Sequence, residues 1–124
     1  MGLVVLLVDD DLAVLGELSR GLRAAGHSVT TARDGLDALE LATTTPPDVV
    51  LADVVMPGLN GYQLCRRLRA HPATAATPVV LMGDTLGAAD RLWAAEVGAR
   101  ELIAKPVAVD LATAAVAAVM GRAP

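Results

Sequence analysis

The chain has 124 residues, the size of one globular domain, which excludes a multidomain enzyme and predicts a single domain over residues 1–124. Its net charge of -4 and its aromatic content of one Trp, one Tyr and no Phe argue against a basic or base-stacking nucleic-acid surface. No apolar run reaches the roughly 18 to 20 residues that span a bilayer, and the single cysteine, Cys65, cannot form an internal disulfide. We therefore expect a cytoplasmic protein with no direct nucleic-acid partner and no membrane partner.

Five short apolar runs, spaced along the whole chain, predict β-strands. They cover residues 3–8, 28–32, 48–52, 78–82 and 100–104. Four of the five are nearly continuous in Val, Leu or Ile, which is typical of strands that are covered on both faces of a parallel sheet. The second run, at 28–32, is more polar and suits an edge strand.

A longer amphipathic stretch follows each of these runs and predicts a helix. The helices are expected at residues 11–25, 35–42, 61–70, 86–97 and 107–120. Asp34 and Asn60 are typical N-cap residues for the second and third helices, and Pro106 can open the last one. Strands that alternate with helices predict an α/β fold with a small doubly wound parallel sheet, whose ligand site lies at the carboxyl ends of the strands.

Three sets of charged residues come directly after predicted strands. Asp9, Asp10 and Asp11 follow the first strand, Asp53 follows the third and Lys105 follows the fifth. A capping role for Asp10 or Asp11 at the first helix accounts for one or two of the three neighbouring acids. Adjacent carboxylates raise one another's proton affinity unless a cation lies among them, so the triplet also indicates a site for Mg²⁺, which prefers hard oxygen ligands.

Asp53 and Lys105 have the chemistry that phosphoryl transfer needs. Asp53 comes shortly before a Pro-Gly turn, and an Asp in such a loop is common without any functional role. A carboxylate at the mouth of a buried strand would also take up a phosphoryl group if a metal and a cation neutralised its oxygens. Lys105 is the only lysine beside nine arginines, and its compact point charge fits a narrow pocket better than a guanidinium fork.

Three segments together resemble the receiver domain of two-component response regulators, over essentially the whole chain. They are Val-Asp-Asp-Asp at 8–11, Leu-Ala-Asp-Val-Val-Met-Pro-Gly-Leu-Asn-Gly at 51–61 and Ala-Lys-Pro at 104–106. The resemblance implies a flavodoxin-like (βα)5 fold, a three-layer sandwich with strand order 2-1-3-4-5.

The same resemblance implies a role for each site residue. Asp53 would be the phosphoacceptor and, with Asp10 and the backbone carbonyl of Val55, a ligand of Mg²⁺. Asp9 would assist through water, and Lys105 would contact the phosphoryl group. The phosphoryl donor would be a phosphohistidine on a sensor histidine kinase or a phosphotransfer protein, and positioning with charge neutralisation would supply most of the catalysis.

The sequence departs from the receiver pattern at two switch positions. Gly83 stands where the family places Ser or Thr, and Leu102 stands where it places an aromatic residue. Asp84 would either set a fourth carboxylate near the phosphoryl group or turn outward as a cap of the fourth helix. We therefore predict an atypical readout through the fourth helix, fifth strand and fifth helix. The outward positions of the last helix are small: Ala114, Ala117 and Ala118.

Other functions remain as alternatives. A pseudo-receiver would bind partners constitutively without phosphorylation, and the residues at 83, 84 and 102 favour it. A dehalogenase-like hydrolase generally has a second Asp where this chain has Val55, and a flavin site lacks a phosphate-binding loop after the first strand. We expect a phosphoacceptor rather than a turnover enzyme, acting on a downstream protein target or a separate output domain. The sequence leaves homodimerisation open.

Overall fold

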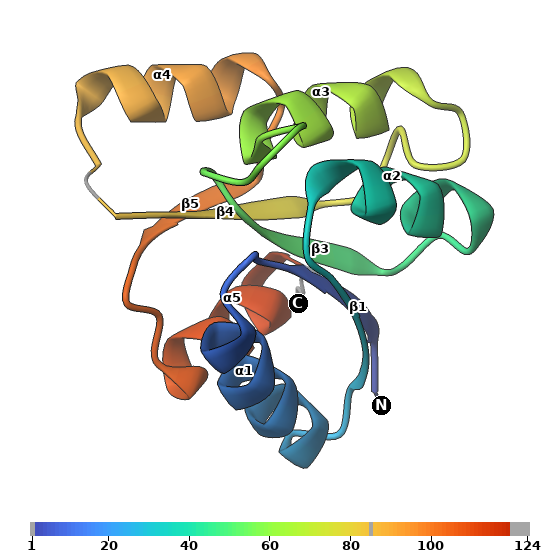
Figure 1. The fold of residues 1–124 in the computed structure, drawn as a ribbon, viewed down its shortest axis with the longest axis vertical. Helices are drawn as coiled ribbons and strands as arrows, with labels where there is room; N and C mark the ends of the chain where they lie inside the picture. The colour runs from blue at the N-terminus through green and yellow to red at the C-terminus, as the bar shows by residue number, and fades with distance from the viewer. Residues whose placement is uncertain (1, 85, 120–124) are drawn as a thin grey trace.

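The computed structural model describes residues 2–84 and 86–119 and shows strands and helices in strict alternation (Figure 1). The strands are β1 (Val4–Val8), β2 (Ser28–Ala32), β3 (Val49–Asp53), β4 (Val79–Gly83) and β5 (Glu101–Ala104). The helices are α1 (Leu12–Ala24), α2 (Gly35–Thr44), α3 (Gly61–Ala70), α4 (Ala88–Glu96) and α5 (Val109–Val119). Every predicted strand is confirmed to within one residue at each end.

The five strands form one parallel sheet in the order β2-β1-β3-β4-β5. Helices α2, α3 and α4 cover one face of this sheet, and α1 and α5 cover the other (Figure 1). This arrangement confirms the three-layer flavodoxin-like fold. None of the helices within the described ranges is long and apolar enough to cross a membrane.

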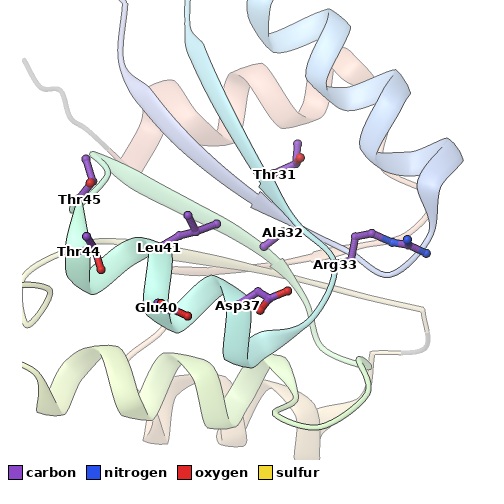
Figure 2. A pocket seen from close by; sticks show the side chains of 8 residues that line it. All are labelled: Thr31, Ala32, Arg33, Asp37, Glu40, Leu41, Thr44 and Thr45. Carbon is purple, nitrogen blue, oxygen red and sulfur yellow. The ribbon is translucent and has the colours of Figure 1, made fainter.

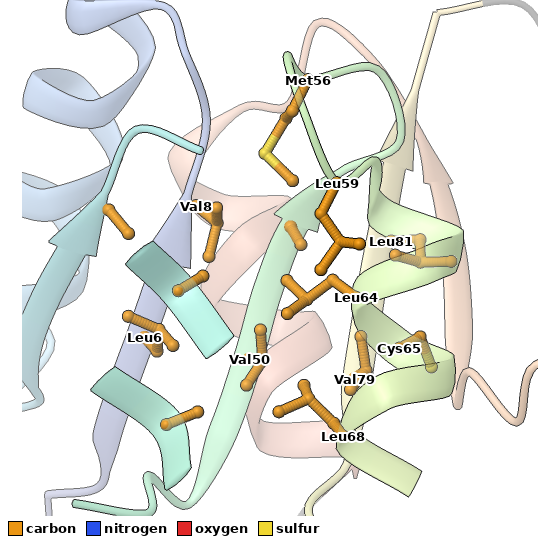
Figure 3. Packing of buried hydrophobic residues seen from close by; sticks show 14 of the residues in the cluster. Leu6, Val8, Val50, Met56, Leu59, Leu64, Cys65, Leu68, Val79 and Leu81 are labelled. Carbon is orange, nitrogen blue, oxygen red and sulfur yellow. The ribbon is translucent and has the colours of Figure 1, made fainter. Parts of the chain in front are cut away.

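Burial along the strands follows their composition. Every residue of β3 and β4 is buried, whereas β2 is mostly exposed and forms an edge, as its polar sequence predicts. Two apolar clusters result, one on each face of the sheet. The cluster under α2, α3 and α4 includes Leu6, Val50, Leu64 and Leu81 (Figure 3), and the cluster under α1 and α5 includes Leu7, Leu18, Leu51 and Val116. Each such side chain stabilises the fold by about 1.5–3 kcal/mol.

The starts of the first four helices show which capping predictions are correct. Asp11 caps α1, because its Oδ1 accepts the N–H groups of Ala13 at 2.9 Å and Val14 at 3.4 Å. Asp34 and Asn60 cap α2 and α3 as predicted. The prediction that Asp84 caps the fourth helix is wrong, because α4 begins at Ala88 and its N-cap is Gly87. Asp84 lies three residues before that N-cap and is exposed, so its carboxylate is outside the first turn.

The last helix starts later than predicted. It begins at Val109, not at residue 107, so Pro106 does not open it. The intervening residues carry the chain from β5 to the face covered by α1, where Val109 packs directly against Gly21. The predicted exposure of Ala114, Ala117 and Ala118 is confirmed. Residue 120, the predicted end of the helix, lies outside the described residues.

Candidate functional site

The carboxyl ends of β1, β3 and β5 bring together the charged residues that the sequence singles out. Asp53 is the last residue of β3, and Asp9 and Lys105 directly follow β1 and β5. Because β4 separates β5 from β3, the lysine side chain must extend across the end of β4 to reach the acids. Its Nζ lies 3.0 Å from Asp53 Oδ2 and 3.1 Å from Asp9 Oδ2, and donates to both.

The two carboxylates are buried, with side-chain exposures of 0% for Asp9 and 8% for Asp53. Their other oxygens accept backbone N–H groups, from Asp11 to Asp9 at 2.9 Å and from Val55 to Asp53 at 3.2 Å. These bonds fix both side chains at the strand ends.

Burial raises the pKa of Asp53, and the nearby charge of Asp9 acts in the same direction. The hydrogen bonds from Lys105 and from the Val55 N–H oppose this shift without cancelling it. Burial lowers the pKa of Lys105, but the hydrogen bonds and charges of the two acids outweigh that effect and leave the pKa above its ordinary value. Lys105 is thus a fixed cation at neutral pH, held beside a carboxylate whose ionisation is costly.

Three carboxylates form a compact set of hard oxygen donors. Asp9, Asp10 and Asp53 each offer one oxygen, and these oxygens lie within 4.8 Å of one another. Asp10 is exposed, and its carboxylate accepts no hydrogen bond from the described residues. The carbonyl of Val55, 72% exposed as a residue, likewise has no donor partner in the described part of the chain. An oxygen-only set with open positions fits Mg²⁺ and does not fit a soft metal.

Asp84 lies beside this site. It lines a hollow of about 310 Å³ together with Lys105, Asp11 and Glu17. A larger hollow, of about 580 Å³, lies between the end of β2 and α2 and is lined by Arg33, Asp37 and Glu40 among others (Figure 2). None of the predicted site residues lines that larger hollow. The larger hollow is therefore not the place where the predicted site residues meet.

The surroundings of Gly83 include a residue that sequence reasoning missed. A Cβ added to Gly83 would lie 2.7 Å from Leu86 Cδ2 and 3.6 Å from Val54 Cγ2. The space over Gly83 is thus taken by an apolar side chain from the β4–α4 loop. Leu102, the second departure from the receiver pattern, is partly buried and packs against the cluster under α2, α3 and α4. No pattern in the sequence signals the contact of Leu86 with Gly83.

The model of the response regulator receiver domain family matches residues 5–117. The chain therefore belongs to the receiver domains of response regulators. Among curated relatives, it is 41% identical over 103 residues to protein PilH of Pseudomonas aeruginosa, covering 83% of this chain and 85% of PilH. It is 40% identical over 118 residues to the transcriptional regulatory protein PrrA of Mycobacterium leprae, covering 95% of this chain and 50% of PrrA. The response regulator PleD of Caulobacter vibrioides is 41% identical over 103 residues, which are 83% of this chain and 23% of PleD.

Solved structures agree with this family. The chemotaxis protein CheY4 of Vibrio cholerae superposes with a TM-score of 0.89 at 28% identity, over 94% of this chain and 97% of CheY4. The receiver domain of the sensor histidine kinase PA1611 of Pseudomonas aeruginosa has a TM-score of 0.85 at 27% identity, over 94% of this chain and 95% of that one. That receiver domain holds a magnesium ion coordinated in its active site cleft.

Proposed function

We propose that this receiver domain accepts a phosphoryl group on Asp53 from a phosphohistidine of a sensor histidine kinase or a phosphotransfer protein. The observation that carries the proposal is the bridge from Lys105 to Asp9 and Asp53, because it places a fixed cation against the acid that ends the fully buried strand β3. Membership of the receiver family supports the phosphorelay class. Each transfer leaves the phosphoryl group on Asp53 of the same chain, so the domain is a phosphoacceptor and not a turnover enzyme.

In the proposed transfer, an Asp53 carboxylate oxygen forms a bond to phosphorus as the bond from phosphorus to the histidine nitrogen breaks. The nitrogen keeps the electron pair of that bond, and the product on this chain is an acyl phosphate. Lys105 Nζ, already 3.0 Å from Asp53 Oδ2, is within reach of the incoming phosphoryl oxygens. Because the lysine is in place before transfer, its charge stabilises the transition state with little reorganisation.

We propose that Asp10, Asp53 and the Val55 carbonyl ligate Mg²⁺ and that Asp9 assists through water. When bound, the ion would neutralise charge on the transferring group and on the clustered acids. The magnesium ion in the PA1611 receiver domain supports this proposal. Asp10 has an exposed carboxylate, which leaves it available to a metal without breaking an internal bond.

The proposed readout passes through α4, β5 and α5 by a route that uses no hydroxyl at residue 83. Leu86 already fills the space over Gly83, so a change at Asp53 would reach the β4–α4 loop as a change in apolar packing. The packing of Leu86 over Gly83 also favours the alternative, a pseudo-receiver that binds partners constitutively. Phosphate incorporation separates the two functions, because only the first one requires it.

The test is labelling of the purified chain by radioactive phosphoramidate or acetyl phosphate, with and without Mg²⁺. We expect label that is stable in acid, labile in base and dependent on Mg²⁺. Asp53→Asn should abolish it, whereas Asp110→Asn, which changes an exposed acid in the first turn of α5, should leave it unchanged. Absence of Asp53-dependent label in a protein whose melting temperature still rises with Mg²⁺ would favour the pseudo-receiver.

A further inference from the structure

Asp84 is a charged residue at the acceptor edge of the sheet that has no structural role among the described residues. It comes directly after β4, and α4 does not use it as a cap, because its N-cap is Gly87. The Gly87 N–H donates to Asp90 at 2.9 Å rather than to Asp84. Asp84 is exposed, and within residues 2–84 and 86–119 its carboxylate has no hydrogen-bond or ion-pair partner. Its charge is therefore available to act on what approaches this edge.

The pairing of the strands places Asp84 on the same side of the sheet as the acceptor. Asp53 is paired with Met82, and Asp84 lies two residues further along the chain, so the alternation of side chains directs all three to one face. Pairing between β4 and β5 continues to this point, because the Lys105 N–H donates to the Gly83 carbonyl at 2.8 Å. Asp84 thus lies one strand away from Asp53, at the edge of the sheet where the acceptor carboxylate ends its strand.

The hollow of about 310 Å³ beside Lys105 shows which charges meet there. Lys105 is the one base among the described residues that line it, and the acids are Asp11, Glu17 and Asp84. The carboxylate of Asp11 is engaged as the N-cap of α1, and Glu17 lies more than one turn further along that helix. The charge of Lys105 is already shared between the two buried acids, at 3.0 and 3.1 Å. In the described part of the chain, no cation is left to balance Asp84.

An unbalanced carboxylate at this place affects the arrival of a phosphoryl group. The group carries about 1.5 to 2 negative charges near neutral pH, so Asp84 repels it. In a hollow open to water, charges of this size a few residues apart change a rate by about fivefold. A protein can offset the repulsion with cationic side chains beside its phosphohistidine, whereas a small free donor brings no such group. The repulsion therefore differs between classes of donor.

We propose that Asp84 is a specificity-determining residue, which repels small anionic phosphoryl donors from Asp53 and so favours a phosphohistidine that a protein presents on a cationic surface. The proposal rests on the acceptor function proposed above for Asp53. Asp84 acts through its charge alone. It forms no bond to the transferred group and takes up no proton during the transfer.

The test compares two small donors that differ in charge. Acetyl phosphate is a dianion near neutral pH, and phosphoramidate is a monoanion. At low salt and saturating Mg²⁺, Asp84→Asn should raise kcat/KM for labelling of Asp53 about fivefold with acetyl phosphate and about twofold with phosphoramidate. Asp84→Lys changes the charge by twice as much and should extend the gain with acetyl phosphate to about 25-fold. At about 1 M salt, where the screening length is about 3 Å, these gains should disappear.

Glu96→Gln is the matched control, because it removes the same charge from another exposed position. Glu96 is the last residue of α4, which leads into the amino end of β5, so it lies at the opposite edge of the sheet from the acceptor. This change should alter the rate with neither donor. Circular dichroism checks that each variant is folded.

Binding of Mg²⁺ in the absence of any donor gives a second measurement, which does not require phosphorylation. The charge that repels a dianion attracts a divalent cation, so Asp84→Asn should weaken Mg²⁺ binding by about fivefold at low salt. The affinity is measured by NMR titration of the wild type and the variant. A change at Asp84 that only disturbed the fold would not raise a rate with an anion and lower the affinity for a cation together.

Three outcomes would overturn the proposal. The first is an unchanged rate with acetyl phosphate in Asp84→Asn. The second is an equal gain with both donors at every salt concentration, which would indicate relief of a steric obstruction. The third concerns a protein in which no donor labels Asp53 in any variant. The acceptor function then fails, and the role of Asp84 is decided by Mg²⁺, since equal binding by the wild type and Asp84→Asn would overturn it.

Discussion

Substitution of Gly61 by Ala should damage both the fold and the acceptor site. A Cβ at this position would lie 2.5 Å from the Asp53 carbonyl oxygen and 2.9 Å from Val54 Cα. Carbon atoms pack at about 3.5–4.0 Å, so the start of α3 and the end of β3 would have to separate by about 0.6–1 Å. Both are held by backbone hydrogen bonds, from Gly61 N–H to Val54 O at 2.9 Å and from Val54 N–H to Met82 O at 2.8 Å.

Overpacking costs about 1–3 kcal/mol, and we expect the upper part of that range because the crowded atoms are backbone atoms. In a domain of this size the melting temperature should fall by about 10 °C. A displacement of Asp53 of this order should also slow its labelling by acetyl phosphate by about 100-fold.

The matched control is Gly16→Ala in α1, where the nearest atom to an added Cβ is Arg20 Nη1 at 3.5 Å. This change should stabilise the protein by about 0.5–1 kcal/mol through helix propensity and leave labelling unchanged. Urea unfolding and the labelling rate are measured for both variants. A Gly61→Ala protein as stable and as rapidly labelled as the wild type would refute the reasoning.

Three further predictions concern the site and its surroundings. Gly83→Ala should lower the free energy of unfolding by about 1 kcal/mol, because the partly exposed Leu86 side chain must move away from the added methyl group. This loss should vanish in a Leu86→Ala background, and equal losses in both backgrounds would contradict the contact. Because burial raises the pKa of Asp53, the fold is favoured when this group is protonated, and that contribution is lost as the pH rises through the raised pKa. Asp53→Asn should therefore be more stable than the wild type in EDTA at pH 7, with an advantage that shrinks on acidification in urea titrations; an advantage that grows would have the wrong sign. Lys105→Arg should slow labelling of Asp53 although the charge is kept, because a guanidinium is wider than the ammonium group that lies 3.0 Å from Asp53 Oδ2 and 3.1 Å from Asp9 Oδ2. A labelling rate equal to that of the wild type would refute this prediction.

The fold could be predicted because its strands are marked by composition. Continuous Val and Leu runs give β1, β3 and β4, and the polar 28–32 segment gives the edge strand β2. The starts of α4 and α5 were less predictable, because each follows a loop whose path depends on tertiary contacts. Helix α5 starts where Val109 meets Gly21 of α1, a contact between residues 88 positions apart that no local pattern contains.

The polar part of the site was predictable for a similar reason. Carboxyl ends of parallel strands meet at one edge, so acids and a lysine placed there had to converge. The apolar part was not, because an aliphatic loop residue such as Leu86 carries no sign of what it packs against.

The lysine bridge also has a mechanical consequence for the sheet. Its acids belong to the central strands β1 and β3, whereas its cation follows β5, a short and largely exposed strand at the edge. Detachment of β5 would withdraw the cation and leave two buried carboxylates facing each other, which is costly. The charge that serves the acceptor therefore also ties an edge strand of the sheet to its middle.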